Sequence, residues 1–541
     1  MREIIKTCIE NGFFLDKEVL NLFSHIKEDK VYEFLNILFS LKIKERVISK
    51  RLIINNFDRI KPAISLEDYP IYEIFFEGIG ANKEVVEEKK EGVVKVLSAP
   101  AFTQRKVSVK DFIDNFRSRY NKIKTIFESR DFDNLTSIRK IGDDRGSYTI
   151  IVYVLGKRIT KNKNLFIEVE DMSGTSIVLI NQNKKELFEK ARDLLEDDLV
   201  AFNVTGTSEM LFANDLFFPD ASLTEKKYSD FDEYVAFTGD FHAGSKLFLE
   251  KNLLKFVNWL NGNEGDKKQR EIAKKVKYLF VTGDVIDGIS HYSGQEKFLT
   301  ALTSVDQYKK VEDVLGKIRK DIQIIMCPGQ HDSVWIGEPQ PIIGERWAPG
   351  LHKMKNLYLV PNPCLVEIDG GFKILMYHGA SINRFVDEIP DIRTNYGHRS
   401  PTRVVREMLK RRHLAPLHGS MDYIPCENGD PLVIETIPDI IATADQHRAD
   451  VSIYNNILMI SGSCWQATTP FEEKVGNVPD PCKVPLFNLK TREIKILDFS
   501  DNLKEIKWEE GDGLACKISD CPKEEECLKE VNCEEKKDGK V

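Results

Sequence analysis

The sequence lacks the features of membrane and secreted proteins. No uninterrupted apolar run reaches the ~20 residues that a membrane-spanning helix needs, so we expect no membrane partner. The first residues, Met1-Arg-Glu-Ile-Ile-Lys, are charged and lead into a polar helical pattern, which predicts no signal peptide. The 10 cysteines show no disulfide-framework spacing before the C-terminal tail, which favours a reducing compartment. We therefore expect a cytoplasmic protein.

An excess of positive charge is also missing. The 78 Lys and Arg residues are outnumbered by 86 Asp and Glu residues, and the formal net charge is −8. This balance argues against a protein coated in basic surface, although it leaves room for a local basic groove. At 541 residues the chain is too long for a single core, which predicts two or three domains.

The first 130 residues are predicted to be a helical module followed by a linker. Residues 1–62 carry apolar side chains at three- and four-residue spacing, which predicts helices. This module could bind a partner or could be a small bundle with solvated charges, and the sequence leaves both open. Residues 63–130 are predicted to be a linker that is disordered in part, because residues 83–92 are a run of mostly charged side chains.

Residues 131–222 have the pattern of a small β-barrel. Three strand-like runs, a helical segment and two further strand-like runs follow one another in ~90 residues, which is the order of an OB-fold. Such barrels bind single-stranded nucleic acid through aromatic side chains on a basic groove. Tyr148 and Tyr153 are available for stacking, but basic residues are sparse outside Lys157, Arg158, Lys161 and Lys163. Docking against another subunit is therefore the slightly favoured alternative.

One sequence pattern, an apolar run that ends in polar residues, recurs through residues 230–500. Tyr234-Val-Ala-Phe-Thr-Gly-Asp-Phe-His and Tyr278-Leu-Phe-Val-Thr-Gly-Asp-Val-Ile-Asp are apolar runs that end in Gly and an acidic residue, as buried strands do. Three later apolar runs also close on ligand-type residues. The polar residues that close the five runs are Asp240, His242, Asp284, Asp287, Gln330, His331, Asp332, His378, Asp445 and His447. A single such residue most often caps a turn. Five in order predict an active site, since ligands collect at the carboxyl ends of strands, and carboxylates mixed with imidazoles suit a pair of divalent metals.

This ordered series resembles the calcineurin-like metallophosphoesterases. A barrel directly before such a domain looks like the small subunits of replicative DNA polymerases, and residues 398–419 are very similar to the small, exonuclease subunits of the archaeal family-D DNA polymerases. The resemblance implies an α/β metallophosphoesterase domain, a mixed β-sandwich flanked by helices, at residues 230–500, after an OB-fold β-barrel at 131–222 and the helical N-terminal module. It also implies a 3′→5′ exonuclease that uses two divalent metal ions, with Mn²⁺ expected. The implied partners are a large catalytic polymerase subunit, DNA with 3′ ends and a sliding clamp.

Carried over to this sequence, the family pattern places two metals on shared ligands. The first metal would be held by Asp240, His242, Asp284 and His447. The second would use Asp284 as a bridge, together with His378 and the positions of Gln330 and Asp445. The family has Asn where Gln330 stands and His where Asp445 stands. The two departures could compensate each other, because one side chain lengthens while the other shortens, or they could mark a weakened second site.

The resemblance also implies a general acid. His331 would protonate the leaving 3′ oxygen, and Asp287 would be the acid that orients it. The alternative is a polymerase subunit kept as a scaffold after it has lost its metals. A phosphatase of proteins or small molecules is a third possibility, against which the preceding barrel and residues 398–419 argue.

Two further stretches carry predictions. Residues 401–413 are predicted to form a helix with Arg403, Arg406 and Lys410 on one face, where they could contact a DNA backbone. A solvated or subunit-facing helix is the alternative. The tail, residues 501–541, contains Cys516, Cys521, Cys527 and Cys533. Zinc sites favour pairs of cysteines two to four residues apart, so this tail is expected to be disordered or helical in short pieces, and a metal-bound tail is the alternative.

Overall fold

A computed structural model describes most of the chain. The described residues are 2–16, 19–20, 23, 28–40, 46–49, 52, 93–102, 106–292, 294–419, 421–475, 477–501 and 503–506. The chain divides into two compact units, residues 1–90 and 91–541. The charged run at 83–92 and the four tail cysteines, about which the sequence makes predictions, lie outside the described residues.

In the first unit, the described residues form two helices and a pair of very short strands. The helices are α1 (Arg2–Glu10) and α3 (Glu28–Ser40), and the strands β1 (Phe14–Leu15) and β2 (Val47–Ile48) pair in parallel. Side chains of both helices, among them Ile4 and Leu35, are fully buried in a shared core. The sequence predicts the helices, whereas nothing in its apolar spacing predicts the strand pair.

The second unit begins with a strand and a long helix where the sequence predicts a linker. Strand β3 (Val94–Ser98) pairs antiparallel with β13 (Cys364–Ile368), and helix α7 spans Val109–Glu128. The linker prediction is therefore wrong for these residues. The sequence does contain a signal for helix α7, because Ser108 and Asp111 form a capping box and the buried residues of α7 recur at helical spacing.

Helix α7 is fixed to the unit by a buried charge network. The Arg119 guanidinium donates to Asp430 Oδ2 over 2.7 Å and to the Pro416 carbonyl over 2.7 Å. His413 Nε2 lies 3.0 Å from the same carboxylate oxygen. The Ala415 backbone N–H donates to His413 Nδ1 over 3.0 Å. Since Nδ1 accepts, the proton of neutral His413 is on Nε2 and is donated to Asp430.

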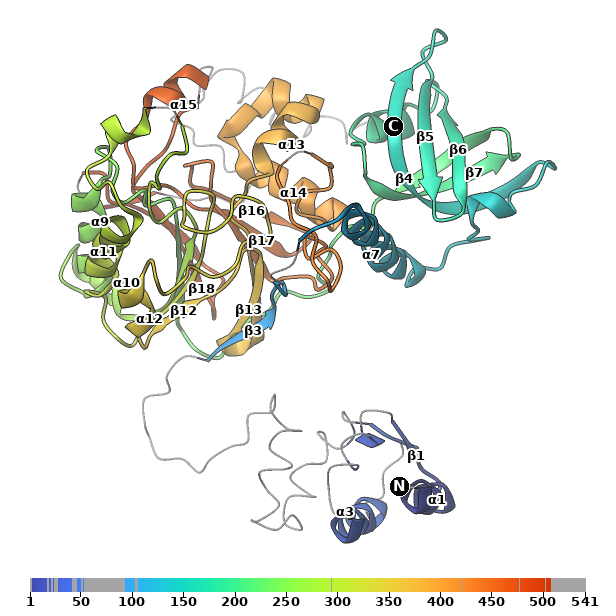
Figure 1. Ribbon diagram of the computed structural model, residues 1–541, viewed down its shortest axis with the longest axis horizontal. Coiled ribbons are helices and arrows are strands. Elements are labelled where there is room, and N and C mark those ends of the chain that lie inside the picture. Colours follow the sequence, from blue (N-terminus) through green and yellow to red (C-terminus); the bar gives the residue numbers. More distant parts are fainter. Residues whose placement is uncertain are drawn as a thin grey trace, which may run out of the picture. The chain divides into compact units, whose positions relative to one another are not determined.

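Residues 146–217 form a closed five-stranded barrel, with the strand order β4-β5-β6-β8-β7 and β7 pairing back to β4. The strands are β4 (Gly146–Ile159), β5 (Leu165–Asp171), β6 (Gly174–Ile180), β7 (Leu199–Gly206) and β8 (Leu211–Phe217). Helix α8 (Lys185–Arg192) lies between β6 and β7 in the chain, so the structure has the predicted order of three strands, a helix and two strands. Figure 1 shows β4, β5 and β6 side by side, with α7 close to β4.

Two mixed sheets make up the α/β domain. The first has the order β12-β11-β10-β9-β18-β19-β20, and the second has the order β16-β17-β15-β14-β13-β3. The strands of the first sheet are β9 (Tyr234–Thr238), β10 (Val276–Thr282), β11 (Gln323–Cys327), β12 (Leu357–Leu359), β18 (Lys483–Asn488), β19 (Ile494–Asp498) and β20 (Lys504–Ile506). Besides β3 and β13, the second sheet contains β14 (Phe372–Met376), β15 (Ile440–Thr443), β16 (Asp450–Tyr454) and β17 (Ile457–Ser461). The five predicted ligand-bearing strands exist, but three belong to the first sheet (β9, β10, β11) and two to the second (β14, β15).

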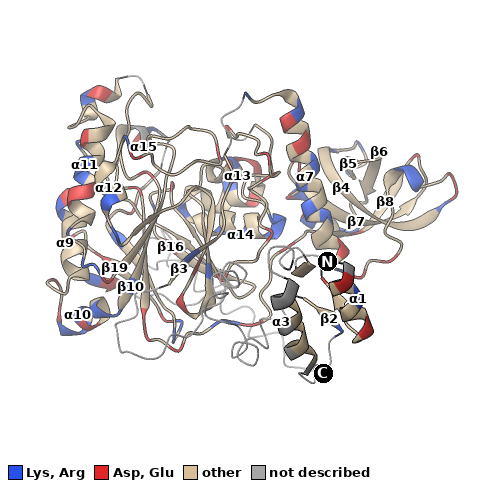
Figure 2. Cartoon of the chain, turned by 60° about the horizontal axis from the view of Figure 1, so that its bottom comes forward, with Lys and Arg blue, Asp and Glu red and all other residues tan. Residues whose placement is uncertain are grey.

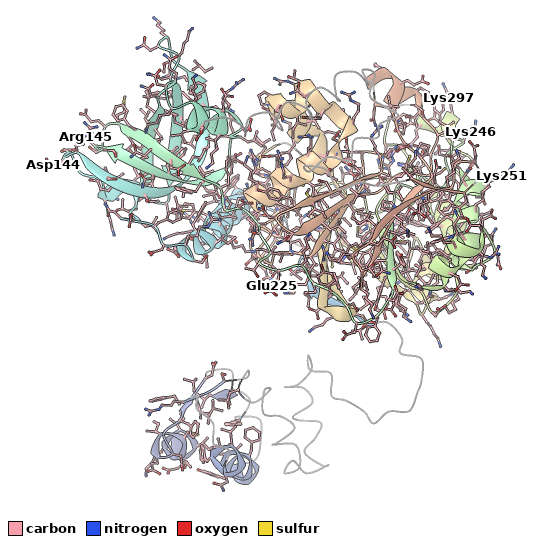
Figure 3. All side chains as sticks on the ribbon, turned by 180° about the vertical axis from the view of Figure 1, so that it is seen from behind. Asp144, Arg145, Glu225, Lys246, Lys251 and Lys297 are labelled. Atoms are coloured by element: carbon pink, nitrogen blue, oxygen red, sulfur yellow. The ribbon has the colours of Figure 1, made fainter. Side chains whose placement is uncertain are left out.

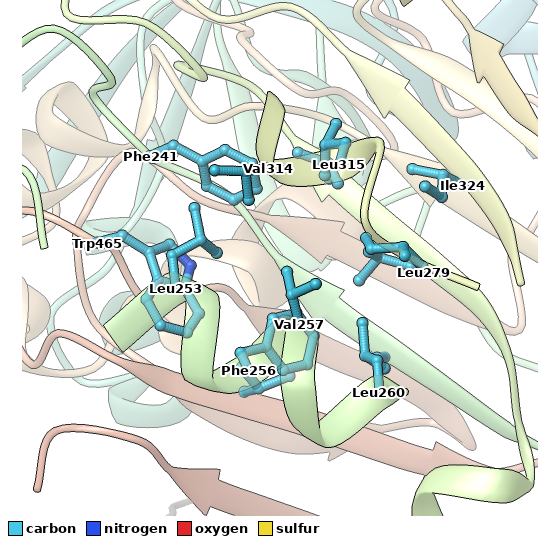
Figure 4. Close-up of a cluster of buried hydrophobic side chains, with 14 of the residues drawn as sticks. Phe241, Leu253, Phe256, Val257, Leu260, Leu279, Val314, Leu315, Ile324 and Trp465 are labelled. Atoms are coloured by element: carbon cyan, nitrogen blue, oxygen red, sulfur yellow. The ribbon is translucent and has the colours of Figure 1, made fainter. Parts of the chain in front are cut away.

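The sheets pack face to face and helices cover their outer faces. Phe237 and Phe280 of the first sheet and Met376 of the second are buried in one cluster between the sheets. The alternate side chains of β9, β10 and β11 point to the other side, where they pack with helices in a separate cluster. Figure 4 shows part of that cluster, in which Val257 and Leu260 lie near Leu279, and Leu253 lies beside Trp465. The predicted mixed β-sandwich flanked by helices is confirmed.

The helices of the α/β domain carry many charged residues, whereas its strands are largely uncharged (Figure 2). They are α9 (Glu250–Leu260), α10 (Lys267–Lys274), α11 (Ser304–Leu315), α12 (Pro349–Lys353), α13 (Ile382–Glu388), α14 (Pro401–Arg411) and α15 (Pro470–Val475). The crossover between β9 and β10 contains α9 and α10. Of the helices in the described ranges, none is both long and apolar enough to cross a membrane.

The barrel and the α/β domain are joined by a buried arginine of α14. Arg411 Nε donates to Asp198 Oδ1 over 2.9 Å, and its guanidinium also bonds Glu407 and the Asp193 carbonyl. Both Arg411 and Asp198 are almost fully buried. Removing one partner of such a pair would leave an uncompensated buried charge, so the pair fixes the barrel against α14.

Candidate metal centre

The polar residues at the five strand ends meet at one place. Backbone hydrogen bonds connect the chain segments after β9 and β10, where the Asp240 N–H donates to the Gly283 carbonyl over 3.0 Å and the His242 N–H to the Asp284 carbonyl over 3.1 Å. The segment after β15 joins them, because the Asp445 N–H donates to Asp240 Oδ2 over 3.0 Å. The carboxyl edges of the two sheets therefore converge on one buried cluster.

Several residues of this cluster have a backbone conformation that L-residues rarely adopt. Asp240, His242, Asp284, Asp445 and His447 all have a positive φ, between 47° and 67°. Such left-handed backbone costs energy for residues other than glycine and persists where the surrounding structure enforces it, often at functional sites. Each of these residues sits in the sharp turn that follows a strand, and the turn directs its side chain to the common point.

The first ligand group consists of Asp240, His242 and His447, whose ligand atoms all lie within 4.8 Å of one another. The two imidazoles face each other, with 3.0 Å between His242 Nε2 and His447 Nε2. His447 Nε2 is 4.0 Å from Asp240 Oδ1. Two imidazole nitrogens and a carboxylate oxygen at these separations could hold one divalent ion.

The second group consists of Asp240, Asp284 and His378. His378 Nε2 is 3.3 Å from Asp284 Oδ2 and 3.8 Å from Asp445 Oδ1. A missing side chain makes this approach possible, because a Cβ on Gly329 would lie 2.3 Å from Asp284 Oδ1 and 2.7 Å from His378 Nε2. Since Asp240 belongs to both groups, the two groups adjoin.

Three histidines of the cluster have one ring nitrogen occupied. His378 Nδ1 is 2.9 Å from the Thr282 carbonyl, and His447 Nδ1 is 2.7 Å from Glu472 Oε1. His331 Nδ1 is 2.7 Å from the Asp287 carbonyl. Each acceptor fixes the proton on Nδ1 and leaves Nε2 as the free ligand or proton-transfer atom, as in carboxylate–histidine–metal arrangements.

Sequence reasoning missed Glu472. This residue lies in α15, and its backbone and side chain form a capping pair with Thr469, whose N–H donates to Glu472 Oε2 over 2.8 Å. The T-P-F-E sequence at 469–472 signals the start of a helix. Nothing in that local signal predicts that the other carboxylate oxygen reaches His447.

Asp287 holds His331 differently from the prediction. Its backbone carbonyl accepts from His331, whereas its carboxylate lies 3.3 Å from His242 Nδ1. Gln295 Nε2 and Gln466 Nε2 each donate to that carboxylate, over 3.0 Å and 2.9 Å. Asp287 thus positions His331 through the main chain and His242 through the side chain.

Gln330 and Asp445, the two departures from the family pattern, contact each other. Gln330 Nε2 donates to Asp445 Oδ1 over 3.2 Å. The other Asp445 oxygen accepts from Gln446 Nε2 over 2.7 Å, and Gln446 is itself tied to Asn383 over 3.0 Å. The structure therefore places both residues at the second group, where the sequence predicts them, and couples them directly.

The cluster brings negative charges together with little exposure to water, since Asp240 and Asp284 are buried and the Asp445 side chain is 13% exposed. Burial, together with the carboxylates of Asp284 and Asp445, raises the pKa of Asp240 to about 7. Burial raises the pKa of Asp445 as well. Burial alone would raise the pKa of Asp284 too, but the neighbouring His378 and His331 outweigh it and lower that pKa. Three carboxylates so close together and so little exposed require compensating positive charge.

Unpartnered atoms at the cluster fit a bound cation. Asp240 Oδ1, His378 Nε2 and Gln330 Oε1 are buried and have no hydrogen-bond partner among the described residues. Buried polar atoms without a partner are rare in native proteins. The three atoms are of the types that bind divalent metals, so the residues present fit a metal site.

The basic residues of α14 do not form one exposed face. Arg403 is largely buried, with its guanidinium 3.4 Å from the centre of the Tyr396 ring. Lys410 pairs with Glu407 over 3.2 Å and lies over Phe218. Only Arg406, of these three, keeps a substantially exposed side chain, at 41%.

Comparisons with known proteins agree with the sequence resemblance. Residues 235–451 match the family of the DNA polymerase alpha/epsilon B subunits. The DNA polymerase II small subunit of Methanothermobacter thermautotrophicus is 35% identical over 411 residues, which cover 75% of this chain and 83% of that protein. The DNA polymerase II small subunit of Archaeoglobus fulgidus is 34% identical over 495 residues, which cover 90% of this chain and 95% of that protein. Among solved structures, vacuolar protein sorting 29 from Cryptosporidium parvum aligns over 52% of this chain and 100% of that chain, with 16% identity and a TM-score of 0.26. That structural similarity is too low to support a conclusion about function.

Proposed function

The chain belongs to the DNA polymerase II small subunit family, and we propose that it removes nucleotides from the 3′ ends of DNA by metal-dependent phosphodiester hydrolysis. The observation that carries this proposal is the set of unpartnered buried ligand atoms at the strand ends, on Asp240, His378 and Gln330. A site that served only to hold the fold together would be expected to pair these atoms, because an unpaired buried polar group costs stability.

In this proposal the first ion is held by Asp240, His242, Asp284 and His447. The second uses Asp284, His378, Gln330 and Asp445. Two divalent ions, Mn²⁺ in our proposal, would neutralise the phosphate oxygens and activate water for attack on phosphorus. Glu472 would keep the His447 ring in the ligand tautomer through its 2.7 Å contact with Nδ1.

His331 would act as the general acid of the reaction. Its Nδ1–H is donated to the Asp287 carbonyl, so the proton that can pass to the leaving 3′ oxygen is a second one, held on Nε2 in the imidazolium form. The backbone N–H of His331 donates to Asp284 Oδ1 over 2.8 Å, which links the position of the acid to that of the proposed bridging ligand. A shift of Asp284 would therefore move the acid as well.

Exposed lysines near the site would contact the DNA backbone. Lys246 follows His242 by four residues, and its Nζ donates to the Lys297 carbonyl over 2.7 Å. Figure 3 shows Lys246, Lys251 and Lys297 on the same part of the α/β domain. Phosphate contacts of this kind position a strand without reading its sequence. Arg406 remains a further candidate, because its side chain is accessible.

We also propose that the barrel is an OB-fold and that the chain assembles with a large catalytic polymerase subunit, with a sliding clamp as a further partner. The barrel order β4-β5-β6-β8-β7 and the helix after the third strand support the OB-fold assignment. The relatives are named as small subunits of a polymerase, and this supports a larger partner.

One observation favours a second candidate function, a scaffold subunit with an impaired second metal site. Asp445 already accepts hydrogen bonds from Gln330 and Gln446. A carboxylate satisfied in this way has less need of a metal than an unpartnered one. The scaffold candidate predicts that the polymerase assembles normally but that this chain hydrolyses no DNA.

A nuclease assay separates the two candidates. The purified full chain, alone and with its large subunit, would be incubated with 5′-labelled single strands and with primers carrying a 3′ mismatch, with and without Mn²⁺. Our proposal predicts Mn²⁺-dependent shortening from the 3′ end, and blocking that end should stop it. Normal assembly with no shortening of either substrate would favour the scaffold.

A further inference from the structure

The loop between β10 and α11 places a second histidine on the proposed general acid. The rings of His291 and His331 stack, with 4.3 Å between their centres and 24° between their planes. Gly288 makes room for this contact, because a Cβ at that position would lie 2.2 Å from His291 Nε2 and 2.5 Å from the His331 carbonyl oxygen. Its φ of 71° also favours glycine. The loop therefore packs directly on the acid.

Two buried glutamines hold this loop in place. Gln295 Oε1 accepts from the His291 N–H over 2.9 Å. Gln307 bonds both backbone groups of Gly288, accepting from its N–H over 2.9 Å and donating to its carbonyl over 3.1 Å. Gln295 and Gln307 are almost fully buried. The loop is thus preformed, and its outward side chains have a defined position beside the acid.

An exposed aromatic side chain and two cations lie on the outer side of the loop. Tyr292, the residue after His291, exposes 50% of its surface. Lys246 Nζ donates to the Lys297 carbonyl over 2.7 Å, and both lysines are exposed on the same part of the α/β domain (Figure 3). Glu296 is the single acidic residue within 288–300, so the two lysines outweigh it. An aromatic ring near cations suits the flat base and the phosphates of a nucleotide.

The position of the acid decides which part of the DNA faces this loop. In the proposed hydrolysis, the bond from phosphorus to the 3′ oxygen of the penultimate nucleotide breaks. The OH of water stays on phosphorus, and one proton ends on the 3′ oxygen. The released nucleotide keeps the phosphate, whereas the oxygen that takes the proton from His331 belongs to the strand that remains. A surface next to His331 therefore faces the retained strand.

We propose that Tyr292 stacks on the base of the penultimate nucleotide and that Lys246 and Lys297 contact the phosphates of the retained strand. This inference rests on the proposed hydrolysis, because it uses His331 as the acid on the leaving oxygen. A docked protein fits this surface less well, since a partner seated on Tyr292 would also cover the neighbouring acid.

The test combines a change in the chain with a change in the substrate. In Mn²⁺, kcat/KM is measured on three 5′-labelled single strands: one normal, one abasic at the penultimate nucleotide and one abasic at the terminal nucleotide. On the normal strand Tyr292→Ala should lower kcat/KM roughly 5- to 140-fold, the range for one base stacked on an aromatic side chain. The penultimate abasic site should lower the wild-type value by a similar factor and should not slow Tyr292→Ala further, because the stacked pair is already lost.

Two further variants control for the loss of a tyrosine. Tyr292→Phe keeps the ring and should cleave the normal strand as the wild type does. Tyr228→Ala removes an exposed tyrosine elsewhere and should change none of the three rates. Its neighbour Ser229 donates its N–H to the Leu489 carbonyl over 2.9 Å, next to the pair of Asn488 with the first residue of β9. Tyr228 thus lies at the amino end of β9, whereas the metal centre lies at its carboxyl end.

The outcomes separate this inference from the proposed function. Additive losses for Tyr292→Ala and the penultimate abasic site would overturn the inference, as would coupling of Tyr292 to the terminal base. Unchanged cleavage by Tyr292→Ala with loss of binding to the large subunit would also overturn it and assign the surface to protein docking. A wild type that shortens none of the strands would refute the hydrolysis itself, whereas equal cleavage by wild type and Tyr292→Ala would refute the retained-strand assignment alone.

Discussion

His413 should make the stability of the protein fall as the pH drops from about 6.5 to about 4. Burial, reinforced by the positive charge of Arg119, lowers the pKa of His413 to about 4, against ~6.5 for an unperturbed imidazole. Protonation would occur at His413 Nδ1, which accepts from the Ala415 backbone N–H. The new ring N–H would then face that N–H, and the hydrogen bond would be lost. Between these pH values the unfolded chain binds the proton and the folded chain does not, so stability is lost as the pH falls. At 1.36 kcal/mol per pKa unit, the difference corresponds to about 3 kcal/mol.

Other groups titrate in the same range, so the test compares two proteins. In His413→Gln the side-chain amide can still donate to Asp430, but it does not titrate. Urea unfolding at pH 7.5 and at pH 4, followed by tryptophan fluorescence, gives the free energy of unfolding of each protein. The difference between wild type and His413→Gln should shift by about 3 kcal/mol between the two pH values. His352→Gln is the control and should give no such shift. Parallel curves for wild type and His413→Gln would refute the reasoning.

Three further predictions concern the candidate metal centre. Glu472→Gln should weaken Mn²⁺ binding about 10- to 100-fold in calorimetric titration. Glu473→Gln, on the exposed side of α15, should not, and equal Mn²⁺ affinities of the two variants would contradict the role of the 2.7 Å contact between Glu472 and His447. Gln330→Asn or Asp445→His alone should not raise the cleavage rate at saturating Mn²⁺. The double change should match or exceed the wild-type rate, because the two side chains share a hydrogen bond. Additive rate gains from the two single changes would rule out compensation between these residues. His331→Ala should slow cleavage roughly 10²- to 10⁴-fold with unchanged metal content, and a parallel fall in metal content would make His331 a ligand.

The sequence predicts the ligand-bearing strand ends because their signal is local. A buried apolar run followed by Gly and Asp, as at Asp240 and Asp284, contains both the strand and the turn that ends it. The residue set of the cluster follows from such runs. The partition of the strands between two sheets does not, since the apolar pattern of β14 or β15 does not specify which neighbour the strand pairs with.

Two of the features that were not predicted depend on tertiary contacts, and a third had a clear helix signal in the sequence. Glu472 reaches His447 across 25 residues of chain, and only the packing of α15 brings them together. Arg411 looks like part of a basic helix, but the structure buries it against Asp198 of the barrel. Helix α7, in contrast, was predictable, because its cap and apolar spacing are as clear as those of the helices that were identified.

Cleavage of a 5′-labelled single strand in Mn²⁺ by wild type and by Asp284→Asn tests the central claim most directly. Asp284 lies 3.3 Å from His378 and its other oxygen accepts from the His331 N–H, so it connects the proposed second ion to the proposed acid. We predict that the wild type shortens the strand from its 3′ end and that Asp284→Asn, with an unchanged melting temperature, does not. Undiminished cleavage by Asp284→Asn would contradict the assignment of this cluster as the metal-dependent active site.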